Sequence, residues 1–136
     1  MQTFDWTVRV YYEDTDSGGV VYYANYLRFM ERARTEWLRA LGFEQDALIR
    51  DAGVIFAVRS ASVDYLRPAR FNEQLTVRST VHNSGRANVV FDQQILRADD
   101  AELLTSGRIK IASLDAETFR PKPMPKDLLE ALSRDA

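Results

Sequence analysis

A change of hydrophobic period near Val54 constrains the fold of this chain more than any other feature. Residues 23–41 repeat apolar side chains at the spacing of a helix, and Gly42 stands where a helix commonly ends. After Val54 apolar residues alternate with a period of two, which predicts strands. These strands are expected at 54–66, 73–82, 87–97 and 103–114, and the alternating segment 7–12 predicts another before the helix.

Short connections join the later strands: a proline-bearing loop at 67–69 and turns at 83–85 and 98–101. Connections this short predict that successive strands are antiparallel neighbours. At about 3.3 Å per residue these strands reach roughly 33–40 Å, so the sheet should curl. We therefore expect one α+β domain over residues 1–136, with one long helix wrapped by a curled five-stranded antiparallel sheet. Its order would be strand, helix and then four strands.

The long helix should have one apolar and one charged side. The apolar side would hold Tyr26, Leu27, Met30, Ala33, Trp37, Leu38 and Leu41. Charged residues from Arg28 to Arg39 would form a solvent-facing side, with pairs such as Arg32 and Glu36.

Two further elements are expected near the ends of this pattern. Residues 44–51 form a short second helix, and after Pro121, Pro123 and Pro125 a short amphipathic segment closes the chain. Because a single helix leaves the sheet edges and outer face uncovered, the pattern favours a dimer.

Composition excludes several classes of protein. With 18 basic and 20 acidic side chains the net charge is −2, which gives no reason to expect a nucleic-acid partner. The chain has no cysteine and a single histidine, His82, so it offers no thiolate nucleophile, no cysteine-based zinc site and no cluster of histidine ligands. It has no apolar run long enough to cross a membrane and no secretory signal, so we expect a cytoplasmic protein.

Residues 11–26 hold the candidate chemistry. They place Asp14 and Asp16 on a turn with Gly18 and Gly19 that opens directly into an aromatic-rich helix. A helix start offers unpaired N–H groups and partial positive charge, and a carboxylate beside such donors suits attack on a polarised carbonyl. The alternative is that Asp16 is only a turn or cap residue, a role we favour for Asp14. The glycines either permit close approach of a substrate or supply positive φ.

This block and two others resemble the hotdog-fold acyl-CoA thioesterases, in the 4-hydroxybenzoyl-CoA thioesterase group and its Tol-Pal-associated YbgC subfamily. The residues that carry the resemblance are 10–16, Gly18 to Tyr22, Asn25-Tyr26, Glu31 to Glu36 and Pro121 to Lys126. The likeness extends over nearly the whole chain. It implies hydrolysis of an acyl-CoA thioester without a cofactor, at sites on the interface of a homodimer, which in many members pairs into a homotetramer.

The resemblance also implies roles for individual residues. Asp16 would be the catalytic carboxylate, and the backbone N–H of Tyr23 would polarise the thioester carbonyl. The candidate substrate contacts are Gly19, Val20, Tyr22, Tyr26 and Arg86. Tyr22 and Tyr26 would line an acyl pocket, although core packing is the favoured alternative for each of them. Arg86 would hold a phosphate of coenzyme A, as basic residues near this place do in relatives, or is an ordinary exposed arginine. The chain departs from the subfamily at Tyr23, where histidine is usual. A backbone N–H does not depend on the side chain, so polarisation should survive.

The sequence leaves the mechanism and the rival functions open. Asp16 is either a nucleophile that forms an anhydride or a general base for water. The acyl donor is coenzyme A or acyl carrier protein. One rival is dehydration of a hydroxyacyl thioester, which is disfavoured because His82 lies outside the motif. The other is a non-catalytic module that binds acyl chains or acyl carrier protein in envelope or lipid metabolism.

Overall fold

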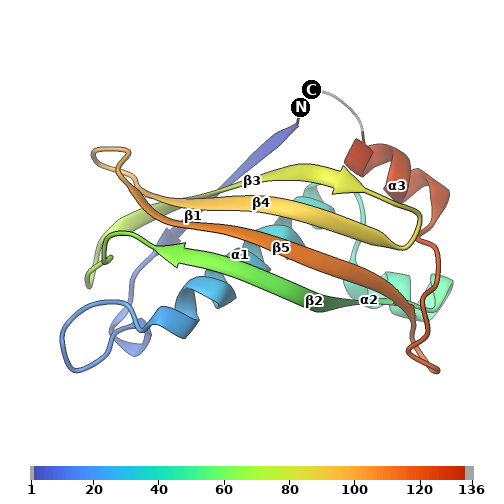
Figure 1. The fold of residues 1–136 in the computed structure, drawn as a ribbon, viewed down its shortest axis with the longest axis horizontal. Coiled ribbons are helices and arrows are strands. Elements are labelled where there is room, and N and C mark those ends of the chain that lie inside the picture. Colours follow the sequence, from blue (N-terminus) through green and yellow to red (C-terminus); the bar gives the residue numbers. More distant parts are fainter. Residues whose placement is uncertain (1, 134–136) are drawn as a thin grey trace.

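The computed structural model describes residues 2–133 as a curled five-stranded antiparallel sheet with one long helix behind it (Figure 1). The strands are β1 (Thr3–Arg9), β2 (Val54–Tyr65), β3 (Gln74–Ser84), β4 (Asn88–Arg97) and β5 (Leu103–Asp115). The helices are α1 (Tyr23–Ala40), α2 (Gln45–Ala47), which continues into a π-helical turn at Leu48–Ala52, and α3 (Lys126–Ser133). The predicted α+β class, with a curled sheet around one long helix, is confirmed.

Strand order corrects one prediction. The order across the sheet is β1-β3-β4-β5-β2, so β2 and β3 are not neighbours although a short loop joins them. Strand β2 instead pairs with β5 from Val54 opposite Asp115 to Tyr65 opposite Thr105. Three strand spacings amount to roughly 14 Å, which the connection 66–73 can span. A short connection therefore fixed the antiparallel direction of β2 and β3 but not their adjacency.

The first strand also lies earlier than expected, because it ends at Arg9 rather than continuing to Tyr12. The Asp14 carboxylate accepts a hydrogen bond from the N–H of Tyr11 at 2.9 Å, and the Asp14 N–H donates to the Tyr11 carbonyl at 3.0 Å. These local bonds turn the chain into a 3₁₀ helix at Tyr12–Asp14. Side-chain to backbone bonds of this kind compete with strand pairing.

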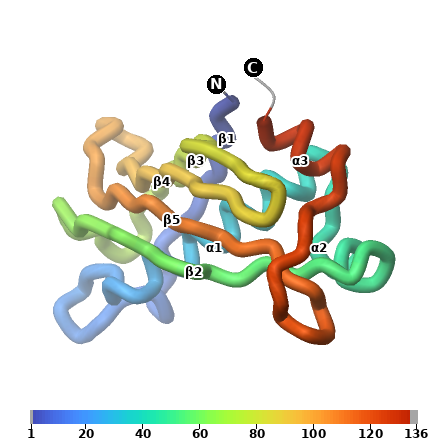
Figure 2. Tube along the Cα trace, turned by 45° about the vertical axis from the view of Figure 1, so that its right-hand side comes forward, coloured from blue at the N-terminus to red at the C-terminus, as the bar shows by residue number. Residues whose placement is uncertain are grey.

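Helix α1 packs its apolar side against the concave side of the sheet, which curves around it (Figure 2). It ends as predicted near Gly42, whose φ of +98° favours glycine. The apolar side was predicted correctly except at Leu27, which is 38% exposed, while Phe29 is buried in its place. The prediction that the charged residues of the helix face solvent is wrong at Arg34, which is buried. Arg39 pairs with Glu36 and, at 3.1 Å, with Glu44.

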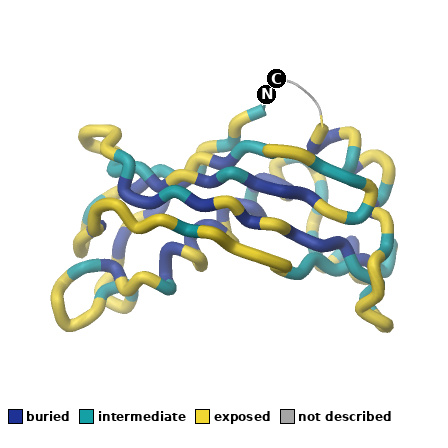
Figure 3. The backbone as a smooth tube through the Cα atoms, viewed as in Figure 1, coloured by how far each residue is buried: buried dark blue, intermediate teal, exposed yellow. Residues whose placement is uncertain are grey.

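Strand β2 is an edge of the sheet and is exposed along residues 58–62 (Figure 3). Its outer edge presents backbone groups with no strand beside them among residues 2–133. Exposed strand edges are templates for pairing with another chain. In the described part of the chain, no helix is both long enough and apolar enough to cross a membrane.

Candidate active site

The Asp16 turn is a tight loop closed by backbone bonds. Thr15 and Val21 face each other as an isolated bridge, and the Asp16 N–H donates to the Val20 carbonyl at 2.9 Å. Gly19 donates its N–H to the Asp16 carbonyl at 3.1 Å and has a φ of +79°. A side chain at Gly19 would strain the backbone, so the turn requires glycine there.

The two aspartates of the turn have different surroundings. Asp14 is a structural residue: its carboxylate holds Tyr11, while its carbonyl accepts from the Tyr22 N–H and the Asn25 side chain, each at 2.9 Å. Asp16 is exposed, and its Oδ1 accepts a bond from the Gly18 N–H at 2.8 Å. Within residues 2–133 its Oδ2 has no hydrogen-bond partner. One carboxylate oxygen thus orients the side chain, and the other remains an unused acceptor of an exposed residue.

The start of α1 presents backbone donors beside the Asp16 turn. Tyr23 is the first helical residue, and Tyr22 before it makes no side-chain cap. The Asn25 N–H turns back to the Tyr22 carbonyl at 2.8 Å, but the Tyr23 N–H has no acceptor among the described residues. The bonds from Asp14 to Tyr22 and Asn25 fix this helix start beside the turn. A free N–H at a positive helix end suits a developing oxyanion.

An aromatic hollow of about 260 Å³ lies against the helix start. Its lining residues are Val21, Tyr23, Tyr26, Tyr65, Leu66, Arg67 and Pro68. The Tyr65 ring is centred 6.0 Å from that of Tyr23 and 5.6 Å from that of Tyr26. The wall from Tyr65 to Pro68 was not predicted from the sequence, because these residues lie far along the chain and only the fold brings them to α1.

Tyr26 joins three parts of the site. Its side chain is only 3% exposed, and its hydroxyl accepts a bond from the Ala69 N–H at 3.0 Å. The Ala69 carbonyl in turn accepts from the Val21 N–H at 2.9 Å. Burial raises the pKa of Tyr26, so its hydroxyl stays neutral. The ring lines the hollow, while the hydroxyl ties α1 to the loop that follows β2.

Among the other predicted residues, Gly19, Val20 and Tyr22 lie on the turn and at the helix start. Tyr22 is partly exposed, and its ring is 4.9 Å from that of Tyr23, whose hydroxyl raises the pKa of Tyr22. The structure therefore brings these residues to the same end of the sheet as Asp16.

Arg86 lies elsewhere. It follows the far end of β3, where its carbonyl accepts from the Met124 N–H at 2.9 Å. The other end of β3, at Gln74, pairs with Arg9 just before the Asp16 turn. The 11 residues of β3 extend about 36 Å at the usual rise per residue. Within one chain, the β3–β4 turn, which holds Arg86, and the loop before α1, which holds Asp16, are thus at opposite ends of the sheet (Figure 1).

Comparison with known proteins places the chain in a family. Residues 10–132 match the thioesterase-like superfamily. The chain is 40% identical over 128 residues to an acyl-CoA thioesterase YbgC of Haemophilus influenzae, covering 94% of this chain and 93% of that protein. It is 41% identical over 126 residues to an acyl-CoA thioester hydrolase YbgC of Escherichia coli, covering 93% and 92%.

Solved structures agree on the fold. A 1,4-dihydroxy-2-naphthoyl-CoA thioesterase from Synechocystis matches with a TM-score of 0.89 and 25% identity, covering 96% of both chains. A 4-hydroxybenzoyl-CoA thioesterase matches with a TM-score of 0.90, covering 98% of this chain and 100% of that one, and at 19% identity it supports the fold alone. The chain belongs to the thioesterase-like superfamily and, within it, to the YbgC acyl-CoA thioesterases. The predicted hotdog fold and the predicted class of enzyme are confirmed.

Proposed function

We propose that this chain hydrolyses acyl-CoA thioesters at the start of α1, with Asp16 as the catalytic carboxylate and the Tyr23 N–H as the oxyanion donor. The observation that carries the proposal is that the turn and the helix start after it each present a polar group with no partner among the described residues. The Asp16 Oδ2 and the Tyr23 N–H, on a turn and a helix joined by Asp14, have no partner among residues 2–133. One such donor contributes about 3–4 kcal/mol to transition-state stabilisation in comparable sites.

The chemistry needs few groups because a thiolate is a good leaving group. A thiol has a pKa of about 8.5, so it departs without a general acid. In one route the Asp16 Oδ2 attacks the carbonyl carbon, the C–S bond breaks, and water opens the resulting anhydride. In the other, Asp16 takes a proton from a water molecule that attacks the same carbon. Both routes release a carboxylic acid and a thiol.

Substrate contacts follow from the positions of the predicted residues. The backbone at Gly19 and Val20 borders the reacting carbonyl, and Tyr22 and the ring of Tyr26 form the acyl wall beside the hollow. These assignments rest on their common location at one end of the sheet.

Arg86 requires a second copy of the chain. We propose a homodimer in which the exposed β2 edges pair about a two-fold axis. This pairing would set the Val54 end of one β2 beside the Tyr65 end of the other. The β3–β4 turn of the partner, with its Arg86, would then come toward the Asp16 turn, within reach of a coenzyme A phosphate. The alternatives are a homotetramer made of two such dimers, and acyl carrier protein in place of coenzyme A as the acyl donor. The proposal also includes a cytoplasmic location.

The direct test is thiol release measured with Ellman's reagent, using acetyl, hexanoyl, palmitoyl and aromatic CoA thioesters. The chain contributes no thiol background because it has no cysteine. Asp16→Asn keeps an oxygen for the Gly18 N–H but removes the charge, and we expect kcat/KM to fall by at least about two decades, or about 2.7 kcal/mol.

The matched control is Asp14→Asn, whose amide oxygen still accepts from the Tyr11 N–H. We expect its activity within about threefold of wild type. Equal rates for Asp16→Asn and wild type would remove Asp16 from the mechanism. A larger loss of activity in Asp14→Asn than in Asp16→Asn would mean that Asp14, and not Asp16, is the catalytic carboxylate. If the chain hydrolysed only acyl-carrier-protein thioesters, acyl carrier protein and not coenzyme A would be the acyl donor.

A further inference from the structure

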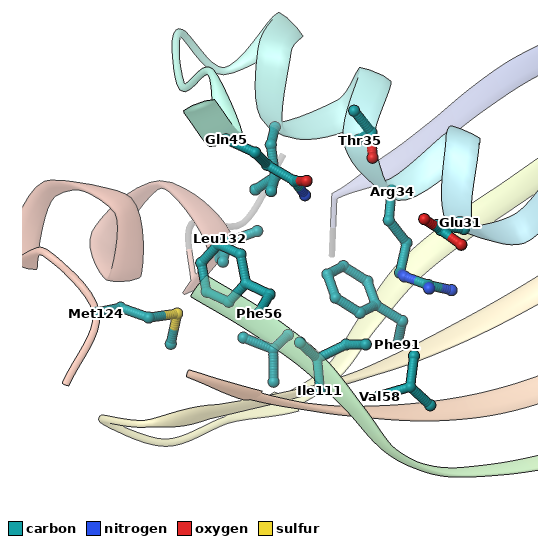
Figure 4. A pocket seen from close by; sticks show the side chains of 12 residues that line it. Glu31, Arg34, Thr35, Gln45, Phe56, Val58, Phe91, Ile111, Met124 and Leu132 are labelled. Carbon is teal, nitrogen blue, oxygen red and sulfur yellow. The ribbon is translucent and has the colours of Figure 1, made fainter. Parts of the chain in front are cut away.

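Two arginine side chains are drawn into the fold, and they differ in their partners. Arg34 lies at a cavity of about 290 Å³ between α1, β2 and α3, beside Glu31 (Figure 4), and donates to Gln93 Oε1 at 2.8 Å. Arg97, at the end of β4, has a side chain that is 20% exposed and binds three carboxylates. Its partners come from the loop 66–73 and from the β4–β5 turn, so Arg97 lies where these two segments meet.

The loop 66–73 is part of the candidate active site. Its first residues line the aromatic hollow. It also holds the turn that carries the candidate carboxylate, at two successive residues. Arg70 faces Val20 as an isolated bridge, and the Ala69 carbonyl accepts from the Val21 N–H at 2.9 Å. The position of the turn therefore depends on the position of this loop.

Glu73 fastens the loop both to itself and to Arg97. Its N–H donates to the Arg70 carbonyl at 3.2 Å, and its Oε1 accepts from the Arg70 N–H at 2.7 Å. Its Oε2 accepts from Arg97 Nε at 2.7 Å. Because Arg70 is the residue that faces Val20, a short series of contacts leads from Arg97 through Glu73 to the catalytic turn.

The remaining donors of Arg97 bind the β4–β5 turn and the loop together. Its Nη1 donates to Asp100 Oδ2 at 3.1 Å and to Glu102 Oε2 at 2.9 Å. Its Nη2 donates to the Pro68 carbonyl at 3.4 Å. Glu102 also pairs with Arg67 of the loop at 3.3 Å. The planar guanidinium thus joins both segments through several bonds at once.

The charges of this cluster are balanced only while Arg97 is present. The carboxylates of Glu73, Asp100 and Glu102 converge on it, and Arg67 contributes a second positive charge. A single exposed ion pair contributes little to stability, but a network around a partly buried arginine contributes more. Without Arg97, three negative charges would face one positive charge, and their repulsion would separate the loop from the β4–β5 turn.

We propose that Arg97 is a positioning residue for thioester hydrolysis, which fixes the loop 66–73 against the Asp16 turn. Arg97 is not among the residues that line the hollow, so it acts through the loop and not on the acyl group. Since β5 separates β4 from the β2 edge, this role needs no partner subunit. The role rests on the proposed function, because it takes the Asp16 turn as the place of the reaction. Small displacements of a reacting group are costly to turnover.

The test is hydrolysis of acyl-CoA by Arg97→Met, with thiol release measured by Ellman's reagent. We expect kcat to be about tenfold lower and KM to stay within about twofold of wild type, because the carboxylate is displaced while Arg97 itself makes no contact with substrate. Arg97→Lys keeps the charge without the fork and should recover part of the loss. The matched control is Arg78→Met, which breaks the two bonds to Asp5 at 2.9 and 3.1 Å and should leave kcat unchanged.

Hydrogen exchange followed by NMR reports on the loop without any turnover. Arg97→Met should speed exchange of the Val21 N–H, which donates to the loop, by about fivefold or more, whereas Arg78→Met should not. If Arg97→Met does not fold, Glu73→Gln serves instead. Its amide can still accept from the Arg70 N–H but loses the charge that Arg97 binds, so it should produce both changes to a smaller extent.

Unchanged kcat or unchanged exchange in Arg97→Met would overturn the positioning role. So would an equal loss of kcat in Arg78→Met, which would indicate general destabilisation, or a rise in KM alone, which would indicate direct contact with substrate. Failure of the proposed function has a different sign, because Asp16→Asn would then be as active as wild type. In that case faster exchange at Val21 would still support, and unchanged exchange would overturn, the hold of Arg97 on the loop.

Discussion

Replacing Tyr26 by phenylalanine tests whether one buried hydroxyl holds the active-site loop. The ring would keep its packing against Phe29 and Tyr65, with centroids at 6.3 and 5.6 Å. The hydroxyl, however, is the acceptor for the Ala69 N–H, and Ala69 is fully buried. The substitution therefore leaves a buried N–H with no partner, and it frees the loop whose carbonyl holds Val21.

The expected loss follows from that unpaired group. An unsatisfied buried donor costs about 1–3 kcal/mol of unfolding free energy. With an unfolding entropy of about 2.1 cal/mol/K per residue, a chain of 136 residues has about 0.29 kcal/mol/K in total. Tyr26→Phe should therefore lower the melting temperature by about 3–10 °C. Thioesterase kcat should fall as well, since Val21 closes the Asp16 turn.

Thermal unfolding followed by circular dichroism measures this loss, with Tyr12→Phe as the control. Tyr12 is 75% exposed and stacks on Phe71 through its ring, so removal of its hydroxyl should change stability by less than about 0.5 kcal/mol. Equal melting temperatures for Tyr26→Phe and Tyr12→Phe would refute the role of the Tyr26 hydroxyl.

The difference should also depend on pH. The pKa of Tyr26 is raised in the folded state, so the neutral hydroxyl makes its full contribution to the free energy of unfolding below pH 10. It is lost as pH rises through the folded-state pKa, and wild type should then approach Tyr26→Phe. A stability gap that stays constant, or grows, above pH 10 would contradict this assignment.

Two further variants test the buried polar contact of Arg34 and the binding of a coenzyme A phosphate by Arg86. Gln93→Leu removes the acceptor of Arg34 and should destabilise the fold by about 2–3 kcal/mol in chemical denaturation. A loss below about 0.5 kcal/mol would show that water replaces the bond. Arg86→Ala should raise KM for acyl-CoA severalfold with kcat unchanged, yet leave KM for N-acetylcysteamine thioesters, which lack phosphates, unaffected. An equal rise in KM for both substrates would remove Arg86 from phosphate binding.

Local signals in the sequence predicted the elements well. The helix from Tyr23 to its end near Gly42, and strands β4 and β5, lie within a residue or two of their predicted bounds. The reason is that turn residues and hydrophobic period act within a few neighbours. The first strand was misplaced because the bond from the Tyr11 N–H to Asp14 is a specific side-chain interaction that the alternating pattern does not reveal.

The candidate site shows the same division. Asp16, Gly19 and Tyr23 are close in sequence, so the turn and the helix start were recognisable from the chain itself. Their free oxygen and free N–H depend on local backbone geometry. Tyr65 and Ala69, by contrast, reach the site only because β2 pairs with β5 and its following loop returns across the sheet.

The sequence by itself determined the order of elements, the glycine turn and the family, because these depend on periodicity, backbone conformation and a contiguous motif. The tertiary structure alone decided strand order, the separation of Arg86 from Asp16, and the burial of Arg34. The helical period predicted that Arg34 lies among charged, solvent-facing residues, and it did not predict the hydrogen bond of Arg34 to Gln93 in β4. Contacts between residues distant in sequence depend on how layers pack, and one-dimensional periodicity carries no information about which distant surface is met.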